Sequence, residues 1–173
     1  MNETVSKRFA LYFRLMMVAW ILIANAFFHI LDFDYSWLVF LSNVMLFTLE
    51  GDIKERFVTV EVGGLVGLIL TVLAMLAIAA LTPVIGGLFG LLIPLAVVLV
   101  ILIILHPYAP KVLNNVGFAY LTVACIDAET FAANLPLFFF VYIVGSLVFN
   151  GVCVLMMKPA MALAKKSAAG AAE

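Results

Sequence analysis

Two acidic pairs are the residues of this chain whose type and spacing could do chemistry. Glu50 and Asp52 follow the apolar stretch "YSWLVFLSNVMLFTL", and Asp127 and Glu129 follow the apolar stretch "VLNNVGFAYLTVACI". Two carboxylates held close together can act as an acid and a base, or can attract a cation or a hydrogen-bond donor. The elements that hold the four acids decide between these chemistries.

The composition predicts a membrane protein. Hydrophobic residues make up 67% of the 173 residues, and charged residues make up only 11%. A soluble domain of this size would leave much of that apolar side chain on its surface, whereas a membrane helix needs about 20 apolar residues to cross the lipid. The chain has room for roughly six such helices. We therefore expect an all-α polytopic membrane protein surrounded by a lipid bilayer.

Six apolar segments can be drawn, of which the second and fifth are short. They cover residues 9–31, 35–49, 57–82, 83–106, 112–126 and 132–157. The first is too long for a cleavable signal peptide and has no small-residue cleavage site after it. We expect a cytoplasmic N-terminus at 1–8, a transmembrane domain at 9–157 and a cytoplasmic tail at 158–173.

The basic residues test this division independently. They form four clusters, which are Lys7, Arg8 and Arg14; Lys54 and Arg56; Lys111; and Lys158, Lys165 and Lys166. With six spans and an internal N-terminus, all nine lie on one side, and the loops 32–34, 82–87 and 126–130 on the other side carry none. A re-entrant fifth segment would put the C-terminal lysines outside. We therefore predict that both termini are cytoplasmic.

The pattern of long, short and long segments occurs twice, in the halves 9–82 and 83–157. Three spans per half is an odd number, so the halves would insert with opposite orientation, as a 3+3 inverted repeat. Short helices at matching positions of such repeats point to a substrate site near the middle of the membrane. The two halves can be aligned by moving along the chain by the number of positions that separates Phe40 from Phe118; we call this the repeat shift. The repeat shift also pairs Gly67 with Gly145, although few other identities appear.

Two stretches carry a family resemblance, "WLVFLSNVMLF…VEVGGLVG" (37–67) and "NNVGFAYLTVACIDAETFAANLPLFFFVYIVG" (114–145). In each, a Phe in the short helix is followed by a Gly in the next long helix, and the spacing between the two is the same in both stretches. This pattern resembles the YcdZ-like bacterial inner-membrane family, whose domain has no known function. The resemblance extends over roughly 12–157. It implies a multi-pass protein of the bacterial inner (plasma) membrane, with no catalytic residues to carry over.

Polar residues inside apolar segments are costly, so they mark candidate sites. We expect a solute path between the second and fifth helices, formed by Asn43, Glu50, Asp52, Asn114, Asn115, Asp127 and Glu129. Carboxylates at the C-terminal ends of the short helices would add to the negative helix ends and favour a cationic or amide-like solute. Further intramembrane candidates are Asn25, His29, Glu61 and Asn150. Hydrogen bonds between helices are the alternative role for each Asn, and Glu61 is near enough to the interface to be solvated.

Other classes of function lack support. The chain has no phosphate loop, Gly-x-Ser-x-Gly elbow or dinucleotide fingerprint, and no ligand spacing typical of a metal site. We therefore predict no enzyme activity, no cofactor and no metal. The net charge of −1 and the absence of a basic face exclude nucleic acid as a partner.

Two functions remain. The first is a channel or transporter for a small solute that is neutral and polar or cationic. The alternative is a non-transporting membrane component, an assembly or partner subunit. Gly-x-x-x-Gly patterns in 63–67 and 86–90 allow close helix packing, either within one subunit or in a homo-oligomer, which we also expect.

Overall fold

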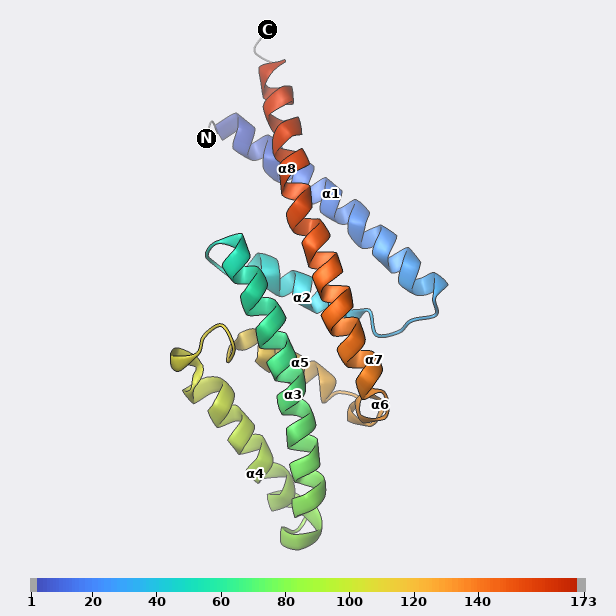
Figure 1. Ribbon diagram of the computed structural model, residues 1–173, viewed down its shortest axis with the longest axis vertical. Helices are drawn as coiled ribbons and strands as arrows, with labels where there is room; N and C mark the ends of the chain where they lie inside the picture. The colour runs from blue at the N-terminus through green and yellow to red at the C-terminus, as the bar shows by residue number, and fades with distance from the viewer. Residues whose placement is uncertain (1–2, 171–173) are drawn as a thin grey trace. The chain divides into compact units, whose positions relative to one another are not determined.

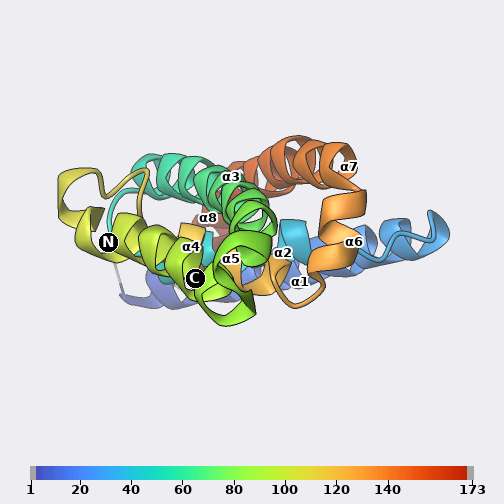
Figure 2. The same cartoon turned by 90° about the horizontal axis from the view of Figure 1, so that it is seen from below.

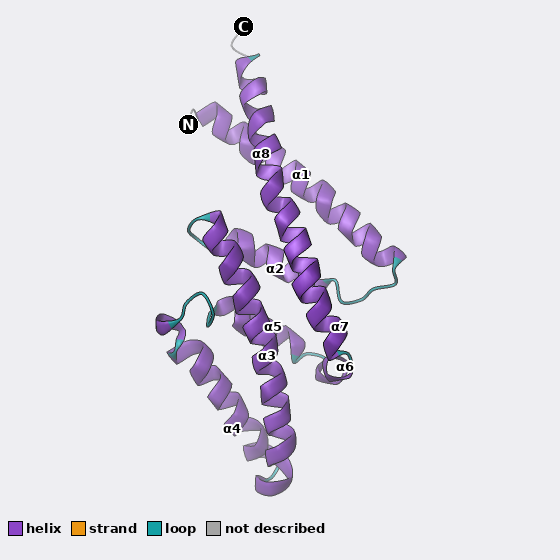
Figure 3. Cartoon of the chain, in the orientation of Figure 1, coloured by secondary structure: helices purple, strands orange, loops and turns teal. Residues whose placement is uncertain are grey.

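The computed structural model describes residues 3–170, and every regular element in that range is a helix (Figure 3). The prediction of an all-α protein is confirmed. Four stretches are long and apolar enough to cross a membrane. They are α1 (Glu3–Ile30), α3 (Ile53–Ile85), α4 (Gly87–Leu99) with its π-helical continuation η1 (Val100–Ile104), and the final stretch Leu135–Ala169.

The second and fifth predicted helices are present and are short. They are α2 (Trp37–Thr48), with 12 residues, and α5 (Asn115–Ala124), with 10 residues. At 1.5 Å per residue these helices are about 18 and 15 Å long, whereas the hydrocarbon layer is about 30 Å thick. Neither can cross it alone, so six complete spans remain a prediction.

Capping residues explain where the helices begin and end. Asp52 accepts a hydrogen bond from the backbone N–H of Lys54 and so starts α3. Gly86 ends α3 with a φ of 85°, a left-handed conformation that a residue with a Cβ seldom adopts. The side chain of Asn114 starts α5 in the same manner as Asp52 starts α3.

Both ends of the chain are more helical than hydropathy predicts. The final stretch consists of α7 (Leu135–Phe140), the π-helical turn η3 (Val141–Ser146) and α8 (Leu147–Ala169). The predicted tail 158–173 begins inside α8, which passes through Pro159. The predicted N-terminal segment 1–8 is helical from Glu3 on. Hydropathy marks the part of a helix that lipid covers, but backbone hydrogen bonding continues past it.

Two compact units make up the chain, and they do not coincide with the predicted halves 9–82 and 83–157. The first unit combines the described residues up to Trp37 with those from Val148 onward, and it contains α1 and nearly all of α8. The second unit, Leu38–Leu147, holds the remaining helices. Within it, α3 and α4 form a hairpin and α5 lies beside α3 (Figures 1 and 2). Their shared apolar core consists of Leu70, Ala74, Val98, Leu102 and Leu121.

Candidate functional site

The closest helix contact in the second unit joins α3 to α5. A Cβ added to Gly67 would lie 2.2 Å from the carbonyl oxygen of Gly117, and one added to Gly63 would lie 2.4 Å from the Asn114 side chain. No side chain fits between backbones at this spacing. The "GGLVG" stretch therefore packs against a helix of the same chain, which is one of the two roles that the sequence allowed.

A second close contact joins η3 to α2. A Cβ added to Gly145 would lie 2.7 Å from Cγ2 of Val39. The repeat shift carries Gly67 onto Gly145, and the same shift carries Val39 onto Gly117. The repeat shift therefore converts one contact into the other: Gly67 corresponds to Gly145, and Gly117 corresponds to Val39.

Two further pairs lie between these contacts, and in each the repeat shift carries one partner onto the other. Gly64 faces Tyr142, whose hydroxyl oxygen would lie 2.3 Å from an added Cβ, and Ser42 makes a side-chain hydrogen bond with Tyr120. The rings of Tyr120 and Tyr142 meet edge to face with their centroids 4.8 Å apart. All four residues are buried, so the centre of the unit contains a polar cluster.

The two tyrosine hydroxyls bond to backbone carbonyls of neighbouring helices. Tyr120 donates to the carbonyl of Leu38 in α2. The hydroxyl of Tyr142 lies 2.9 Å from the carbonyl oxygen of Val60 and 3.0 Å from that of Glu61. These bonds satisfy the two buried hydroxyls and connect neighbouring helices.

Glu61 is the acidic residue of this cluster. Its Oε2 atom lies 2.5 Å from the hydroxyl oxygen of Ser146, which is fully buried in η3. Glu61 follows the first residue of α3 by eight positions, which is about 12 Å along the helix axis. The sequence placed Glu61 about one turn into its span and near water, whereas its carboxylate is half-buried and bonded inside the protein.

The predicted asparagines divide by role. Asn43 is buried in α2. Asn114 caps α5 by accepting from the N–H groups of Val116 and Gly117, and its amide donates to the carbonyls of Thr59 and Pro110. Asn115 is exposed. A cavity of about 290 Å³ beside the start of α5 is lined by Leu102, Ile103, His106, Asn114, Asn115 and Phe118.

The four loop acids lie at the surface, and both aspartates belong to the following helix. Glu50 and Glu129 are exposed. Asp52 caps α3, and Asp127 caps α6 (Ala128–Ala133) by accepting from the N–H of Thr130. Each aspartate therefore stabilises the positive N-terminus of the next helix, and the expected place of the four acids along a solute path stays a prediction. The hydrogen bonds from Thr130 also lower the pKa of Asp127.

The C-terminal end of α2 instead carries a cation. Nη1 of Arg56 donates to the carbonyls of Leu46 and Leu49, at 3.3 and 3.1 Å. A guanidinium at the end of a helix neutralises the partial negative charge of the last carbonyls. This contact fixes the end of α2 against the start of α3.

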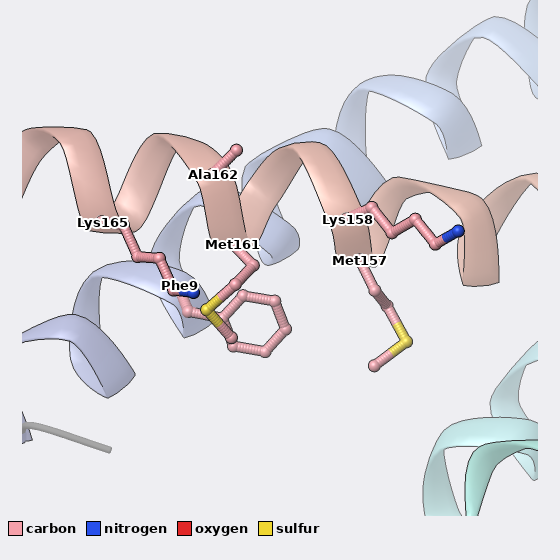
Figure 4. A pocket seen from close by; sticks show the side chains of 6 residues that line it. All are labelled: Phe9, Met157, Lys158, Met161, Ala162 and Lys165. Atoms are coloured by element: carbon pink, nitrogen blue, oxygen red, sulfur yellow. The ribbon is translucent and has the colours of Figure 1, made fainter.

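The first unit holds the other predicted polar residues. Asn25 and His29 are exposed on α1, and the amide of Asn25 donates to the carbonyl of Ile21 in its own helix. Asn150 is fully buried in α8. A groove of about 440 Å³ lies between α1 and α8; Phe9 and Met161 lie close together in it, and Lys158 and Lys165 are among its lining residues (Figure 4).

Sequence reasoning missed Ser42, Tyr120, Tyr142 and Ser146. A usable signal was present, because the repeat shift pairs Ser42 with Tyr120 and Gly64 with Tyr142. These pairs are not identical residues but residues complementary in size or hydrogen bonding, so a comparison by identity does not reveal them. Among residues 3–170, no group of three or more His, Cys, Asp or Glu side chains could hold a metal ion.

Fold and site together define a class: residues 3–170 are all-helical, with four helices long and apolar enough to cross a membrane and a largely buried polar cluster that the two short helices share with α3 and η3. No protein-family model matches the chain, and searches of curated proteins and of solved structures each find no match. Membership of the YcdZ-like family stays a prediction.

Proposed function

We propose that this protein is a channel or transporter for a small solute, neutral and polar or cationic, in the bacterial inner membrane. In this proposal six spans form a 3+3 inverted repeat, both termini are cytoplasmic, and the solute crosses at the polar cluster of the second unit. The observation that carries the proposal is the exchange between the Gly67–Gly117 contact and the Val39–Gly145 contact.

A two-fold relation explains this exchange. If the repeat shift maps one half onto the other, a contact between two residues in different halves must recur with the roles reversed. Residues that the shift carries onto each other, such as Gly64 and Tyr142, then meet on the axis. Glu61 lies near Ser146 and Gly64 near Tyr142, so α3 and η3 pass each other in opposite directions. Inverted repeats of this kind place a transport site at their interface.

The short helices support a path at the same place. The backbone ends of α2 and α5 would fall within the thickness of the membrane, where they are tolerated only against protein or water. The hydroxyls and amide around these helices provide hydrogen bonds that a polar solute can exchange for its own hydration. The cluster contains the side chains of Ser42, Tyr120, Tyr142, Ser146 and Glu61, and Asn43, the residue after Ser42, is also buried.

The distribution of charge supports six crossings. Lys111 pairs with Glu55 at 3.2 Å, so the loop before α5 and the start of α3 belong to the same end of the second unit. Four crossings would separate these basic residues from those of the termini, whereas six crossings gather all nine on one side.

Flux into proteoliposomes tests the function. Purified protein should accelerate the entry of at least one of urea, glycerol and methylammonium relative to empty vesicles. Asn43→Ala and Tyr120→Phe should reduce that flux, whereas Thr122→Val, on the exposed side of α5, should not. Asp127→Asn and Glu129→Gln test the loop acids in the same assay. A well-folded protein that carries none of the three probes would overturn the proposal.

The alternative, a non-transporting subunit of a membrane assembly, has one observation in its favour. Ala24 is the only buried residue described in α1, and large side chains such as Leu22, Phe27 and Ile30 are more than half exposed. Lipid, a second copy of the chain or a partner could cover this surface. We propose a homo-oligomer, which mass measurement in nanodiscs would test. A monomer that retains flux would exclude it.

A further inference from the structure

The hydroxyl of Ser146 lies between two acceptors. One is Oε2 of Glu61, at 2.5 Å, and the other is the backbone carbonyl oxygen of Tyr142, one helical turn earlier. A serine hydroxyl carries one hydrogen and can donate only one full hydrogen bond. If Glu61 were ionised, two acceptors would compete for the single hydrogen of a fully buried serine hydroxyl.

Both contacts of Ser146 have a hydrogen if the carboxyl group of Glu61 is protonated and supplies the second one. A buried helical serine commonly donates to the carbonyl four residues earlier, which here is that of Tyr142. The hydrogen between Ser146 and Glu61 then belongs to the carboxyl group, which donates to the serine oxygen. The hydroxyl of Tyr142 cannot supply it, because that hydroxyl faces the carbonyls of Val60 and Glu61.

We propose that Glu61 is a proton-binding site, that it holds its proton in this conformation, and that its protonation couples solute movement to a proton gradient. The coupling rests on the proposed transport function, whereas the bound proton does not. On release, the proton passes from Oε2 to water and Glu61 becomes negative. Ser146 then turns its hydrogen from the Tyr142 carbonyl to the carboxylate, and the carbonyl loses that donor.

The surroundings of Glu61 fit a group that changes charge. Two titratable side chains that interact electrostatically with it are Tyr120 of α5 and Tyr142 of η3, and α2 brings the non-titrating Ser42 to Tyr120. Both tyrosines are neutral hydroxyls, so the charged form of Glu61 gains no countercharge from them. Proton release therefore favours a conformation that brings water to the carboxylate, which links proton binding to a change of shape.

Glu61 and Ser146 also break the two-fold relation. The repeat shift pairs Glu61 with Phe139 and Ser146 with Leu68, and both of these partners are apolar. Glu61 lies in the first half and Ser146 in the second, and the repeat shift turns this polar pair into the apolar pair Phe139 and Leu68, so the acid and its hydroxyl partner occur at only one of the two related positions. The pair lies at the π-helical turn η3, and such turns within α-helices are frequent at functional sites. Packing alone needs no such asymmetry.

Infrared difference spectroscopy of the protein in nanodiscs tests the bound proton directly. We expect a carboxylic acid C=O band that persists at neutral pH, where exposed acids with ordinary pKa values near 4 are ionised. Glu61→Gln should abolish the band and Ser146→Ala should shift it, whereas Glu55→Gln, on the exposed face of the same helix, should leave it unchanged. A neutral-pH spectrum without any band sensitive to Glu61→Gln would overturn the proposal.

A flux measurement then separates coupling from transport. In proteoliposomes, an imposed pH gradient should change the rate for whichever of urea, glycerol or methylammonium the wild type carries. Glu61→Gln should lose that response and Glu55→Gln should keep it. If the wild type carries no probe but the band is present, the transport function fails while the proton site stands. If flux in the wild type ignores the gradient, coupling through Glu61 is wrong.

Discussion

Gly67 and Gly117 come so close that a Cβ on Gly67 would lie 2.2 Å from the carbonyl oxygen of Gly117. Backbone cannot move aside as the tip of a side chain can. This contact positions α5 against α3, and with it Tyr120, whose hydroxyl reaches α2. The packing of one glycine thus determines the position of the polar cluster.

A series of glycine substitutions tests this packing. Gly67→Ala should lower the free energy of unfolding by about 1–3 kcal/mol, the usual range for overpacking. Gly145→Ala should cost less, because its nearest neighbour is a methyl group of Val39. Gly151→Ala is the matched control: nothing lies within 4 Å of its added Cβ, so it should gain roughly 0.5–1 kcal/mol from helix propensity. Denaturant titration in detergent measures all three, and equal effects at Gly67 and Gly151 would refute the argument.

Cysteine accessibility in intact cells distinguishes six crossings from four. Native Cys125 is exposed and serves as the external reporter, with Cys153→Ala as the background. Under six crossings, Lys54→Cys and Ala169→Cys are both protected from an impermeant reagent while Cys125 is labelled, because all basic clusters are cytoplasmic. Each new cysteine is introduced together with Cys125→Ser, so that only the new cysteine can be labelled. Labelling of Lys54→Cys together with protection of Ala169→Cys would favour four crossings.

Arg56 should stabilise the second unit through α2. Arg56→Met keeps an apolar stem but removes the donors to Leu46 and Leu49, so it should cost about 2 kcal/mol, in the range of hydrogen bonds from charged groups. Lys54→Met, exposed on the same turn, is the control and should change stability little. Chemical denaturation measures both. Equal stability of the two variants would mean that the end of α2 does not need the cation.

The cap of α6 should depend on pH. Because hydrogen bonds from Thr130 lower the pKa of Asp127, the ionised form is the one that holds α6. The backbone amide hydrogens at the start of α6 should therefore be fully protected from exchange above the ordinary aspartate pKa of about 3.9, and should lose this protection as the pH falls through the lowered pKa. Hydrogen exchange measured at Thr130 and Phe131 tests this. Asp127→Asn should keep the cap without the acid transition, and a transition that persists in that variant would assign it elsewhere.

Hydropathy predicted the helices well, because a membrane helix needs apolar residues whatever it packs against. It located α2 and α5 closely at both ends, and α1 and α3 were recognised as long. At their polar ends α1 and α8 extend past the apolar runs, because helical hydrogen bonding continues there. Six crossings and their orientation remain predictions from charge.

The candidate site was only partly predictable. Asn43, Asn114 and Glu61 stand out in the sequence as costly polar residues, and in the structure the two asparagines are buried and Glu61 is half-buried. The loop acids drew attention by their charge, yet two of them are helix caps, which spacing alone does not distinguish from a ligand pair. Tyr142 and Ser146 carry no charge and lie in an apolar run, so nothing in their local sequence marked them.

The sequence by itself determined the class of protein, since composition and hydropathy follow from the solvent that surrounds each segment. The weak repeat shift was also present in the sequence, but only the tertiary structure turned it into reciprocal contacts. Which side chains meet depends on where helices cross, and a crossing is set by backbone approach between residues far apart in the chain. The close approach of Gly67 to α5 positions Tyr120. The crossing of α3 with η3 places Ser146 beside Glu61, and because these two residues are far apart in the chain, no local sequence pattern predicts their contact.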